Sequence, residues 1–360
     1  MATGNAAMMS RVAQAMNARA LAYAYAGLFG AVLLLILGVT IFGRAAPPAA
    51  GVDLQKAPHT RPARASAKPF LAQAPEKPQQ LSPLPVPPPI TRPIYAGRAL
   101  IADPALIENT ATGPLPRIAD DGRKPLDAYA PVPAAKGPRI AIVIGGLGVS
   151  ARATAAALDQ LPAGVTLAFP PYLSDVRHWV SEARARGHEV LLQVPMEPYD
   201  YPDSDPGPRT LRVGAPEDAN IERLNWAMTR FTGYAGITNL LGGRLLGDRN
   251  ALEPVMNDVS RRGLMFFDST SGSRSAAPEV AAQMKAPFVG STVTIDSVQS
   301  PADIDERLSQ LEDAARASGC AAGSGFVYPV TIARIRNWAD GLSGRGFVLV
   351  PASAIVAGGK

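Results

Sequence analysis

Short apolar runs alternate with longer amphipathic segments through residues 139–356 of this 360-residue chain. Several runs are continuously apolar, which is typical of strands covered on both faces. The apolar runs predict strands at 140–144, 165–169, 189–194, 236–241, 264–268, 293–296, 325–328 and 347–350. The amphipathic segments predict helices at 151–160, 174–186, 217–232, 250–262, 275–285, 301–318 and 331–342. Seven or eight such repeats predict an α/β fold, a parallel sheet curved into a distorted (β/α) barrel with the helices outside.

A different pattern precedes this domain. Residues 20–42 contain no charged side chain and follow a short N-terminal tail, 1–19. As a helix these 23 residues would span about 34 Å, enough for the ~30 Å hydrocarbon core of a bilayer. We therefore expect an uncleaved transmembrane anchor, because the apolar core of a signal peptide is shorter. Cleavage in the Ala-rich stretch 45–50 is the alternative, and the short tail favours a cytoplasmic N-terminus.

Residues 45–138 form a proline-rich linker that holds 20 of the 35 prolines of the chain. Such a segment favours extended, polyproline-like geometry, so we expect a stalk between anchor and domain. Its last part, 98–130, is richer in aliphatic residues and is expected to dock on the domain. Recruitment of a protein partner by the proline-rich stalk is the alternative role.

The positive charge of the chain belongs to its N-terminal part. Residues 1–138 carry 14 Lys and Arg against 7 Asp and Glu, whereas residues 139–360 carry 21 against 23. A nearly neutral domain has no electrostatic footprint for nucleic acid. The single cysteine, Cys320, excludes an intramolecular disulfide and a cysteine-rich zinc site.

The first predicted strand of the domain ends in two glycines, Gly145 and Gly146. The loop after the first strand of a parallel α/β domain is a favoured place for ligands. We expect its backbone N–H groups to be available to an anion, and the missing side chains to leave room for a sugar or peptide. The sequence is not Gly-x-Gly-x-x-Gly, so no dinucleotide cofactor is predicted.

The third predicted strand continues into the sequence Pro-Met-Glu-Pro, residues 195–198. Gln193 and Glu197 lie at or just beyond the strand end, where they are candidates to hydrogen-bond a sugar hydroxyl. The alternative is a rigid turn in which Glu197 is solvated or bonded to backbone amides. The motif by itself favours neither reading.

The segment 236–244 supplies two more candidates, Asn239 and Arg244. The guanidinium of Arg244 has the fork that grips a carboxylate or an oxyanion. An internal ion pair of Arg244 with Asp268 or Asp248 is the alternative.

Three later strand ends also carry polar residues. Asp268 ends the strand at 264–268 and Ser269 follows it, and Asp296 ends the strand at 293–296. Each aspartate is a candidate to orient a substrate or an arginine, and a strand-end aspartate is also a common helix cap. Tyr328 ends the strand at 325–328 and can stack on a sugar.

These motifs, in this order, resemble those of the divergent polysaccharide deacetylase family over residues 139–355. The resemblance implies a distorted (β/α) barrel, hydrolysis of a carbohydrate and an envelope location. The first strand of that family typically ends in two aspartates that serve as base and metal ligand, where this chain has Gly145 and Gly146. The family's histidines correspond to Leu240 and Tyr328, so the resemblance extends to the fold but not to the metal ligands.

The histidines His59, His178 and His188 do not follow any predicted strand. A zinc-dependent deacetylase needs a ligand set such as Asp-His-His. We therefore expect no metal and no other cofactor. The leading hypothesis is a pseudoenzyme that binds a glycan or another cell-envelope polymer, anchored in the inner membrane with its domain facing the periplasm.

Two other classes of function stay open. The chain is an active carbohydrate deacetylase or hydrolase if Asp268, Asp296 and Glu197 converge on one water or ion in a rearranged, all-oxygen site. It is a scaffold if the stalk recruits partners and the barrel is only a platform.

Overall fold

The computed structural model describes residues 102–130, 137–270, 272 and 274–356. Within these ranges no helix is long and apolar enough to cross a membrane. The expected tail, the anchor at 20–42 and the linker up to residue 101 lie outside the described residues.

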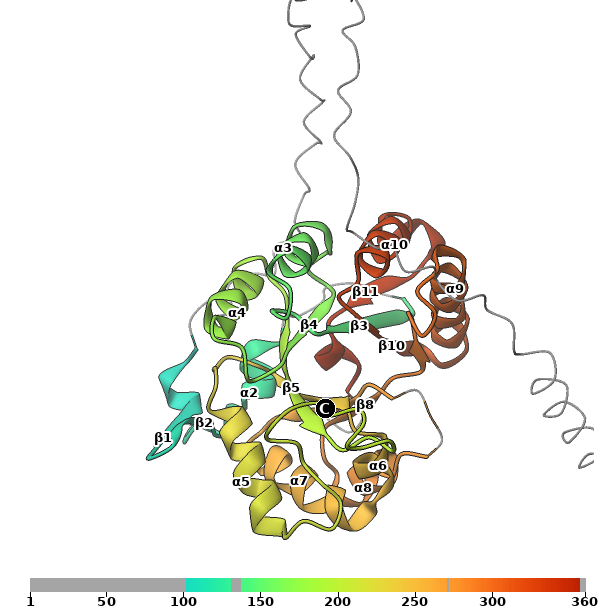
Figure 1. The fold of residues 1–360 in the computed structure, drawn as a ribbon. Coiled ribbons are helices and arrows are strands. Elements are labelled where there is room, and N and C mark those ends of the chain that lie inside the picture. The colour runs from blue at the N-terminus through green and yellow to red at the C-terminus, as the bar shows by residue number, and fades with distance from the viewer. Residues whose placement is uncertain (1–101, 131–136, 271, 273, 357–360) are drawn as a thin grey trace, which may run out of the picture. The chain divides into compact units, whose positions relative to one another are not determined.

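The centre of the described domain is a nine-stranded parallel sheet (Figure 1). Its strands are β3 (Arg139–Gly145), β4 (Thr166–Phe169), β5 (Val190–Met196), β6 (Gly236–Leu241), β7 (Met265–Asp268), β8 (Phe288–Gly290), β9 (Val293–Thr294), β10 (Cys320–Phe326) and β11 (Val348–Val350). Their order is β8-β7-β6-β5-β4-β3-β10-β9, with β11 paired to the first residues of β3. The predicted parallel sheet of barrel type is thus confirmed.

The two ends of this sheet are joined by only two residues. Ser291 N donates to Asp268 O at 2.8 Å, on the β7 side. Thr292 N donates to Ala322 O at 2.7 Å, on the β10 side. The chain between β8 and β9 therefore leaves one edge of the sheet and joins the other, which curves the sheet into a barrel-like form.

Seven helices cover the outside of the sheet in the part of the chain that the structure describes (Figure 1). They are α3 (Ala151–Gln160), α4 (Val176–Ala185), α5 (Glu217–Met228), α7 (Arg249–Arg261), α8 (Ala277–Met284), α9 (Pro301–Ser318) and α10 (Pro329–Asp340). Ser150 and Ser300 cap α3 and α9 by accepting backbone N–H groups three residues later. All seven were predicted, with shifts of a few residues at their ends.

The prediction was wrong at the strand placed over 325–328. The strand β10 runs from Cys320 to Phe326, and Tyr328 is the N-cap residue of α10. The sequence of β10 is rich in Ala, Ser and Gly because α9 lies close to it: a Cβ at Gly323 would be 2.6 Å from a methyl carbon of Leu311. Because these small residues do not form an apolar run, the sequence pattern does not indicate a strand here. The short strand β8 was missed as well.

Residues before the barrel pack against its flank. They form a 3₁₀ helix, η1 (Pro104–Leu106), a hairpin of β1 (Ile107–Thr110) and β2 (Gly113–Pro116), and the helix α2 (Pro125–Tyr129). Leu126 N donates to Gly263 O at 3.1 Å, and the Arg262 guanidinium donates to Pro116 O at 3.2 Å. These bonds attach the hairpin and α2 to the end of α7.

The two faces of the sheet bury two separate apolar clusters. The outer cluster includes Ile140, Ile142 and Ile144 and continues into the helices. The inner cluster includes Ala141 and Val143 and consists mainly of strand residues. Alternate residues of a strand point to opposite faces, so the smaller cluster fills the inside of the barrel.

Candidate functional site

The inside of the barrel changes from apolar to polar toward the carboxyl ends of the strands. In five strands or directly after them, the residue two positions after the last residue of the inner apolar cluster also faces the inside of the barrel. These five residues are Gly145, Gln193, Ser269, Ser291 and Ser324. Ser291 Oγ lies 3.0 Å from Ser324 Oγ, and the Ser324 hydroxyl donates to Ser269 O at 2.7 Å. These bonds form a polar layer of neutral groups directly beneath the strand-end loops.

Gln193 and Phe326 fill the space beside the two glycines. Gly146 N donates to Gln193 Oε1 at 2.8 Å, and a Cβ at Gly145 would lie 2.5 Å from Gln193 Nε2. Gly146 has a φ of +78°, and a Cβ there would lie 2.1 Å from Cζ of Phe326. The expectation that the missing side chains leave open space is therefore wrong.

A metal of the kind the family uses does not fit these residues. The carboxylate positions after β3 are glycines packed against Gln193 and Phe326. Tyr328 is the residue before the first turn of α10, and its ring packs on that of Phe326, with ring centroids 5.3 Å apart. Among the described residues, no three His, Cys, Asp or Glu side chains are grouped so that they could hold a metal ion. The rearranged site of Asp268, Asp296 and Glu197 is thus not assembled as a metal-holding group.

Glu197 is buried and bonded through both carboxylate oxygens. Its Oε1 accepts from the Arg244 guanidinium at 2.7 Å, and its Oε2 accepts from Val213 N at 2.7 Å. Its backbone carbonyl accepts from the backbone N–H groups of Arg244 and Leu245, both at 3.1 Å. Arg244 therefore grips the carboxylate of Glu197, whereas the alternative was an ion pair with Asp268 or Asp248. The Arg244 side chain stays half-exposed, at 50%.

Asn239, Asp268 and Ser269 lie together at the ends of β6 and β7. Asn239 Oδ1 accepts from Ser269 N at 2.8 Å, and Asn239 Nδ2 donates to Leu241 O at 2.6 Å. Asp268 Oδ1 accepts from the backbone and the hydroxyl of Thr270, at 2.8 and 2.5 Å. These three candidates therefore shape the turns at the strand ends.

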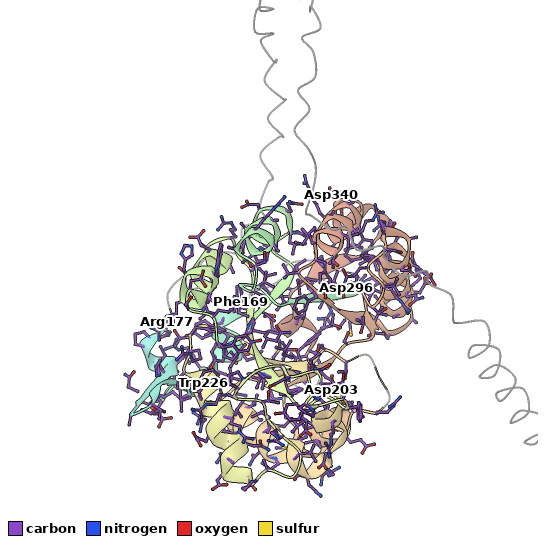
Figure 2. All side chains as sticks on the ribbon, viewed as in Figure 1. Phe169, Arg177, Asp203, Trp226, Asp296 and Asp340 are labelled. Atoms are coloured by element: carbon purple, nitrogen blue, oxygen red, sulfur yellow. The ribbon has the colours of Figure 1, made fainter. Side chains whose placement is uncertain are left out.

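Asp296 accepts a hydrogen bond from the backbone of Phe326, the residue whose ring covers Gly146. Figure 2 labels Asp296 on the half of the domain that α9 and α10 cover. Its Oδ2 accepts from Phe326 N at 2.7 Å and from the Thr331 hydroxyl at 2.9 Å. Burial raises the pKa of the Asp296 carboxyl, which these two bonds partly offset. Its contacts position Phe326 and α10.

The strand-end loops expose a set of large apolar side chains that sequence reasoning missed. We call Val149, Tyr172, Tyr199, Leu241 and Val298 the C-terminal rim. They follow or end β3, β4, β5, β6 and β9, and the carboxyl ends of parallel strands share one edge. The other large apolar residue exposed in the described ranges is Ile118, beyond the β1–β2 hairpin. The sequence did hold a signal for this rim, because each of these apolar residues lies at or shortly after the end of a strand.

One rim residue is held in an unfavourable backbone conformation. Leu241 has a φ of +58° and is 46% exposed. A bulky side chain in this left-handed region costs about 1 kcal/mol or more and is found where the surroundings enforce it. Here the Asn239 side chain binds Leu241 O, and Gly242 follows with a φ of +92°.

Tyr199 packs on the short helix α6 (Gly243–Gly247), whose C-cap residue is Asp248. Its ring would be 2.9 Å from a Cβ at Gly243, and its hydroxyl 3.1 Å from a Cβ at Gly247. Asp248, the next residue, lines a cavity of about 320 Å³. The other walls are Val213, Gly214, Ala215, Glu217, Asn220, Asn250, Ala251 and Pro254. Arg274 lies over the Tyr199 ring, 5.7 Å from its centroid. The cavity wall thus combines apolar residues with the polar side chains of Glu217, Asn220, Asp248 and Asn250.

Comparisons with known proteins agree with this geometry. Residues 142–356 match the family described as divergent polysaccharide deacetylase. The uncharacterized protein YibQ of Escherichia coli is 27% identical over 197 residues, 54% of this chain and 60% of that protein. An uncharacterized protein of Haemophilus influenzae is 25% identical over 195 residues, 54% of this chain and 69% of its own length. The crystal structure of an uncharacterized protein of Agrobacterium tumefaciens is 42% identical, with a TM-score of 0.66, and the match covers 68% of this chain and all of that one.

Proposed function

Because the chain belongs to the divergent polysaccharide deacetylase family, we propose that it binds a glycan at the C-terminal rim without metal-dependent hydrolysis. The observation that carries this proposal is the filling of the space beside Gly145 and Gly146 by Gln193 and Phe326. A metal-dependent hydrolase needs carboxylates and an open ligand position at its catalytic ion. Here that space is packed, while the loops around it present apolar side chains to solvent.

Tyr199 and the cavity beside it suit a sugar. A sugar ring has apolar C–H faces that pack on an aromatic ring, and hydroxyls that bond to carboxylates and amides. We infer that one sugar ring stacks on Tyr199 and that hydroxyls of the same glycan reach Glu217, Asp248 and Asn250. The half-exposed guanidinium of Arg244 is available to an acidic substituent of the glycan.

The test is glycan binding by the purified full chain in a neutral detergent. N-acetylated chito-oligosaccharides and soluble muropeptides are the probes, and isothermal titration calorimetry gives the dissociation constants. We expect Tyr199→Ala to weaken binding about fivefold, because aromatic packing contributes about 1 kcal/mol and about 1.4 kcal/mol is a factor of ten. The control is Ile118→Ala, which removes an exposed apolar side chain outside the rim and should leave the dissociation constant unchanged.

The competing function is an active deacetylase. Acetate release from either probe, abolished by Asp268→Asn, would establish it and overturn the loss of catalysis. Failure of both probes to bind the wild-type chain would overturn the glycan proposal and favour the scaffold hypothesis. Deletion of residues 45–101 would then identify the stalk as the partner-binding part if it abolished partner recovery.

We propose further that residues 20–42 anchor the chain in the inner membrane with the domain in the periplasm. The support is the uncharged apolar stretch and the proline-rich segment that follows it. Protease added to spheroplasts should digest the domain, whereas protease added to intact cells should not. Recovery of the full-length chain after protease treatment of spheroplasts would contradict this orientation.

A further inference from the structure

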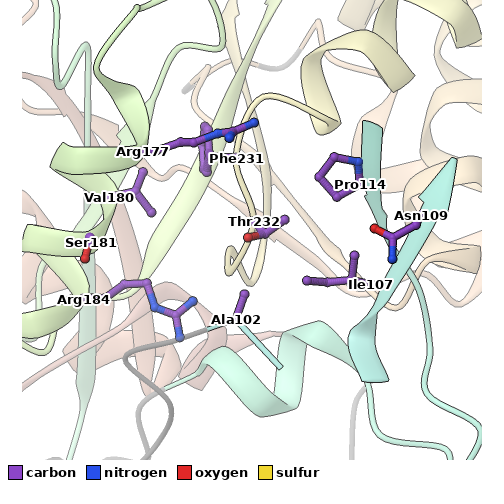
Figure 3. Close-up of a pocket in the computed structure, with 10 residues that line it drawn as sticks. All are labelled: Ala102, Ile107, Asn109, Pro114, Arg177, Val180, Ser181, Arg184, Phe231 and Thr232. Atoms are coloured by element: carbon purple, nitrogen blue, oxygen red, sulfur yellow. The ribbon is translucent and has the colours of Figure 1, made fainter. Parts of the chain in front are cut away.

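A second cavity lies outside the barrel, between the β1–β2 hairpin and α4. Its volume is about 410 Å³, within the range typical of small-molecule sites. Its walls are Ala102, Ile107, Asn109, Pro114, Arg177, Val180, Ser181, Arg184, Phe231 and Thr232 (Figure 3). None of these residues belongs to the C-terminal rim or to the cavity beside Tyr199, so this is a separate place on the molecule.

Two arginines on one helix form the basic wall of this cavity. Arg177 and Arg184 are seven residues apart on α4, which is two helical turns, so their side chains leave the same face. Figure 3 shows them on the α4 side, opposite Ile107, Asn109 and Pro114 of the hairpin. Arg177 Nε donates to Arg230 O at 3.1 Å, and its side chain lies in an exposed position.

Arg184 is more deeply placed. Its guanidinium donates to Gly233 O and lies over the Tyr129 ring, 4.6 Å from the centroid. Burial lowers the pKa of Arg184, because taking the charge out of water disfavours the charged form.

Among the residues that the structure describes, no acidic side chain lines the cavity. The acidic residues next to its walls in the sequence are engaged with other arginines. Asp103 pairs with Arg123, and Glu182 pairs with Arg186 at 2.5 Å. Glu108 lies 3.6 Å from Arg262. The two charged side chains among the described walls, Arg177 and Arg184, are both basic.

The rest of the wall is divided between apolar and neutral polar groups. Val180 lies between the two arginines on α4, and Phe231, Ile107 and Pro114 extend the apolar surface. Asn109, Ser181 and Thr232 add neutral groups that can donate hydrogen bonds. A wall that combines two guanidinium groups with apolar side chains matches a ligand that is itself amphiphilic.

We propose that this cavity binds a small organic oxyanion, a carboxylate or a phosphate monoester carried on an apolar body. The guanidinium groups of Arg177 and Arg184 bind the oxyanion, since their planar forks match carboxylate and phosphate. The apolar body packs between Val180, Phe231 and the hairpin. A ligand in this position touches both α4 and the hairpin, so it also stabilises the attachment of residues 102–116 to the barrel.

The experiment is calorimetric titration of the full chain in neutral detergent with four probes: benzoate, phenyl phosphate, benzyl alcohol and inorganic phosphate. We expect saturable binding of benzoate or phenyl phosphate, and at least tenfold weaker binding of benzyl alcohol and of inorganic phosphate. The stronger of the two anions identifies the oxyanion. Equal binding of benzyl alcohol would overturn the role of the arginines, and equal binding of inorganic phosphate would overturn the role of the apolar wall.

Two exposed variants test the assignment without disturbing the core. Arg177→Gln should weaken binding of the preferred anion at least tenfold, whereas Arg336→Gln, an exposed arginine on α10, should leave it unchanged. Asn109→Asp keeps the shape of the wall but adds a negative charge, and should weaken phenyl phosphate more than benzoate. Unchanged affinity in both Arg177→Gln and Asn109→Asp would overturn the proposal. Tyr199→Ala should not alter binding of these anions, which separates this site from the proposed glycan site.

Discussion

The two ends of the barrel are closed by different kinds of groups. At the carboxyl ends of the strands, the neutral side chains of Gln193 and Phe326 close the space beside the glycines. At the opposite end, just before β5, a fully buried carboxyl, Glu189, accepts from the Thr166 hydroxyl at 3.0 Å and from Ser353 N at 3.2 Å. Burial raises the pKa of Glu189 from 4.5 to about 7.

The comparison shows that the two ends of the barrel are filled by different side chains, a buried carboxyl at one end and an amide and an aromatic ring beside the glycines at the other. Glu189 holds η3 (Ala352–Ile355), the last described element, against β4 and β5. Gly145 and Gly146 end the first strand of the barrel, where the family typically has two aspartates. Gln193 and Phe326 pack against these glycines. At the amino ends of the strands, the hydrogen bonds of Glu189 and Thr166 connect distant segments. At the carboxyl ends, side chains pack on the two glycines below the exposed C-terminal rim.

The largest effect is expected from restoring a side chain at the packed end. Gly146→Ala should lower the free energy of unfolding by about 4 kcal/mol, since the left-handed φ costs about 1–2 kcal/mol and the clash with Phe326 about 1–3 kcal/mol. Gly122→Ala is the matched control, because Gly122 also has a positive φ but no atom within 4 Å of its Cβ position. It should cost about 1–2 kcal/mol in chemical denaturation. Equal losses in the two variants would mean that Phe326 does not occupy the space.

The next effect concerns the opposite end and depends on pH. The folded-state pKa of Glu189 lies above its unfolded value, so the folded state holds the proton between about pH 4.5 and 7. Stability from this group is therefore full below pH 4.5 and is lost as the pH rises to 7, by about 3 kcal/mol in total. Glu189→Gln, which stays neutral, should remove this loss in urea titrations at pH 5 and pH 8.

Glu306→Gln, an exposed glutamate on α9, serves as control for that measurement. It should keep the pH dependence of the wild-type chain. If the Glu189→Gln variant keeps the pH dependence of the wild-type chain, burial does not raise the pKa of Glu189 in the folded state.

A smaller effect tests Glu197, one of the buried carboxylates at the carboxyl end of the barrel. Glu197→Ala should lower the free energy of unfolding by about 2 kcal/mol, because it leaves Val213 N and Arg244 without their buried acceptor. Arg244→Ala should cost about 1 kcal/mol or less, since its guanidinium is half-exposed. A double-mutant cycle by thermal denaturation measures the coupling. Equal costs for the two single variants would argue that Glu197 is held only by its ion pair.

The smallest expected effect distinguishes the backbone strain of Leu241 from its proposed contact with the glycan. Leu241→Gly should raise the free energy of unfolding by about 0.5 kcal/mol, since glycine relieves the positive φ but gains entropy when unfolded. It should also weaken glycan binding severalfold. Lys285→Gly relieves the same kind of φ at the end of α8 and should give the same stability change with no loss of glycan binding. Loss of binding in both variants would remove Leu241 from the proposed glycan surface.

Periodicity predicted the helices well because their apolar faces are long. The segment 301–318 is α9 residue for residue, starting at the Ser300 cap. β10 was misplaced because its close contact with α9 requires glycine and alanine, which carry no apolar signal. α6 and β8 are too short for a periodic pattern. The exposed rim was missed because a single apolar residue in a loop looks the same whether it is buried or exposed.

The sequence by itself determined the parallel α/β architecture, the seven covering helices and the replacement of the family's metal ligands, since these depend on local pattern and on residue identity. Only the tertiary structure decided what the glycines at 145 and 146 mean. Gln193 and Phe326 reach them from β5 and β10, strands that are distant in sequence. The partner of Arg244, the exposure of the rim and the arginine-lined cavity are likewise set by side chains that meet only when the sheet curves and its loops come together.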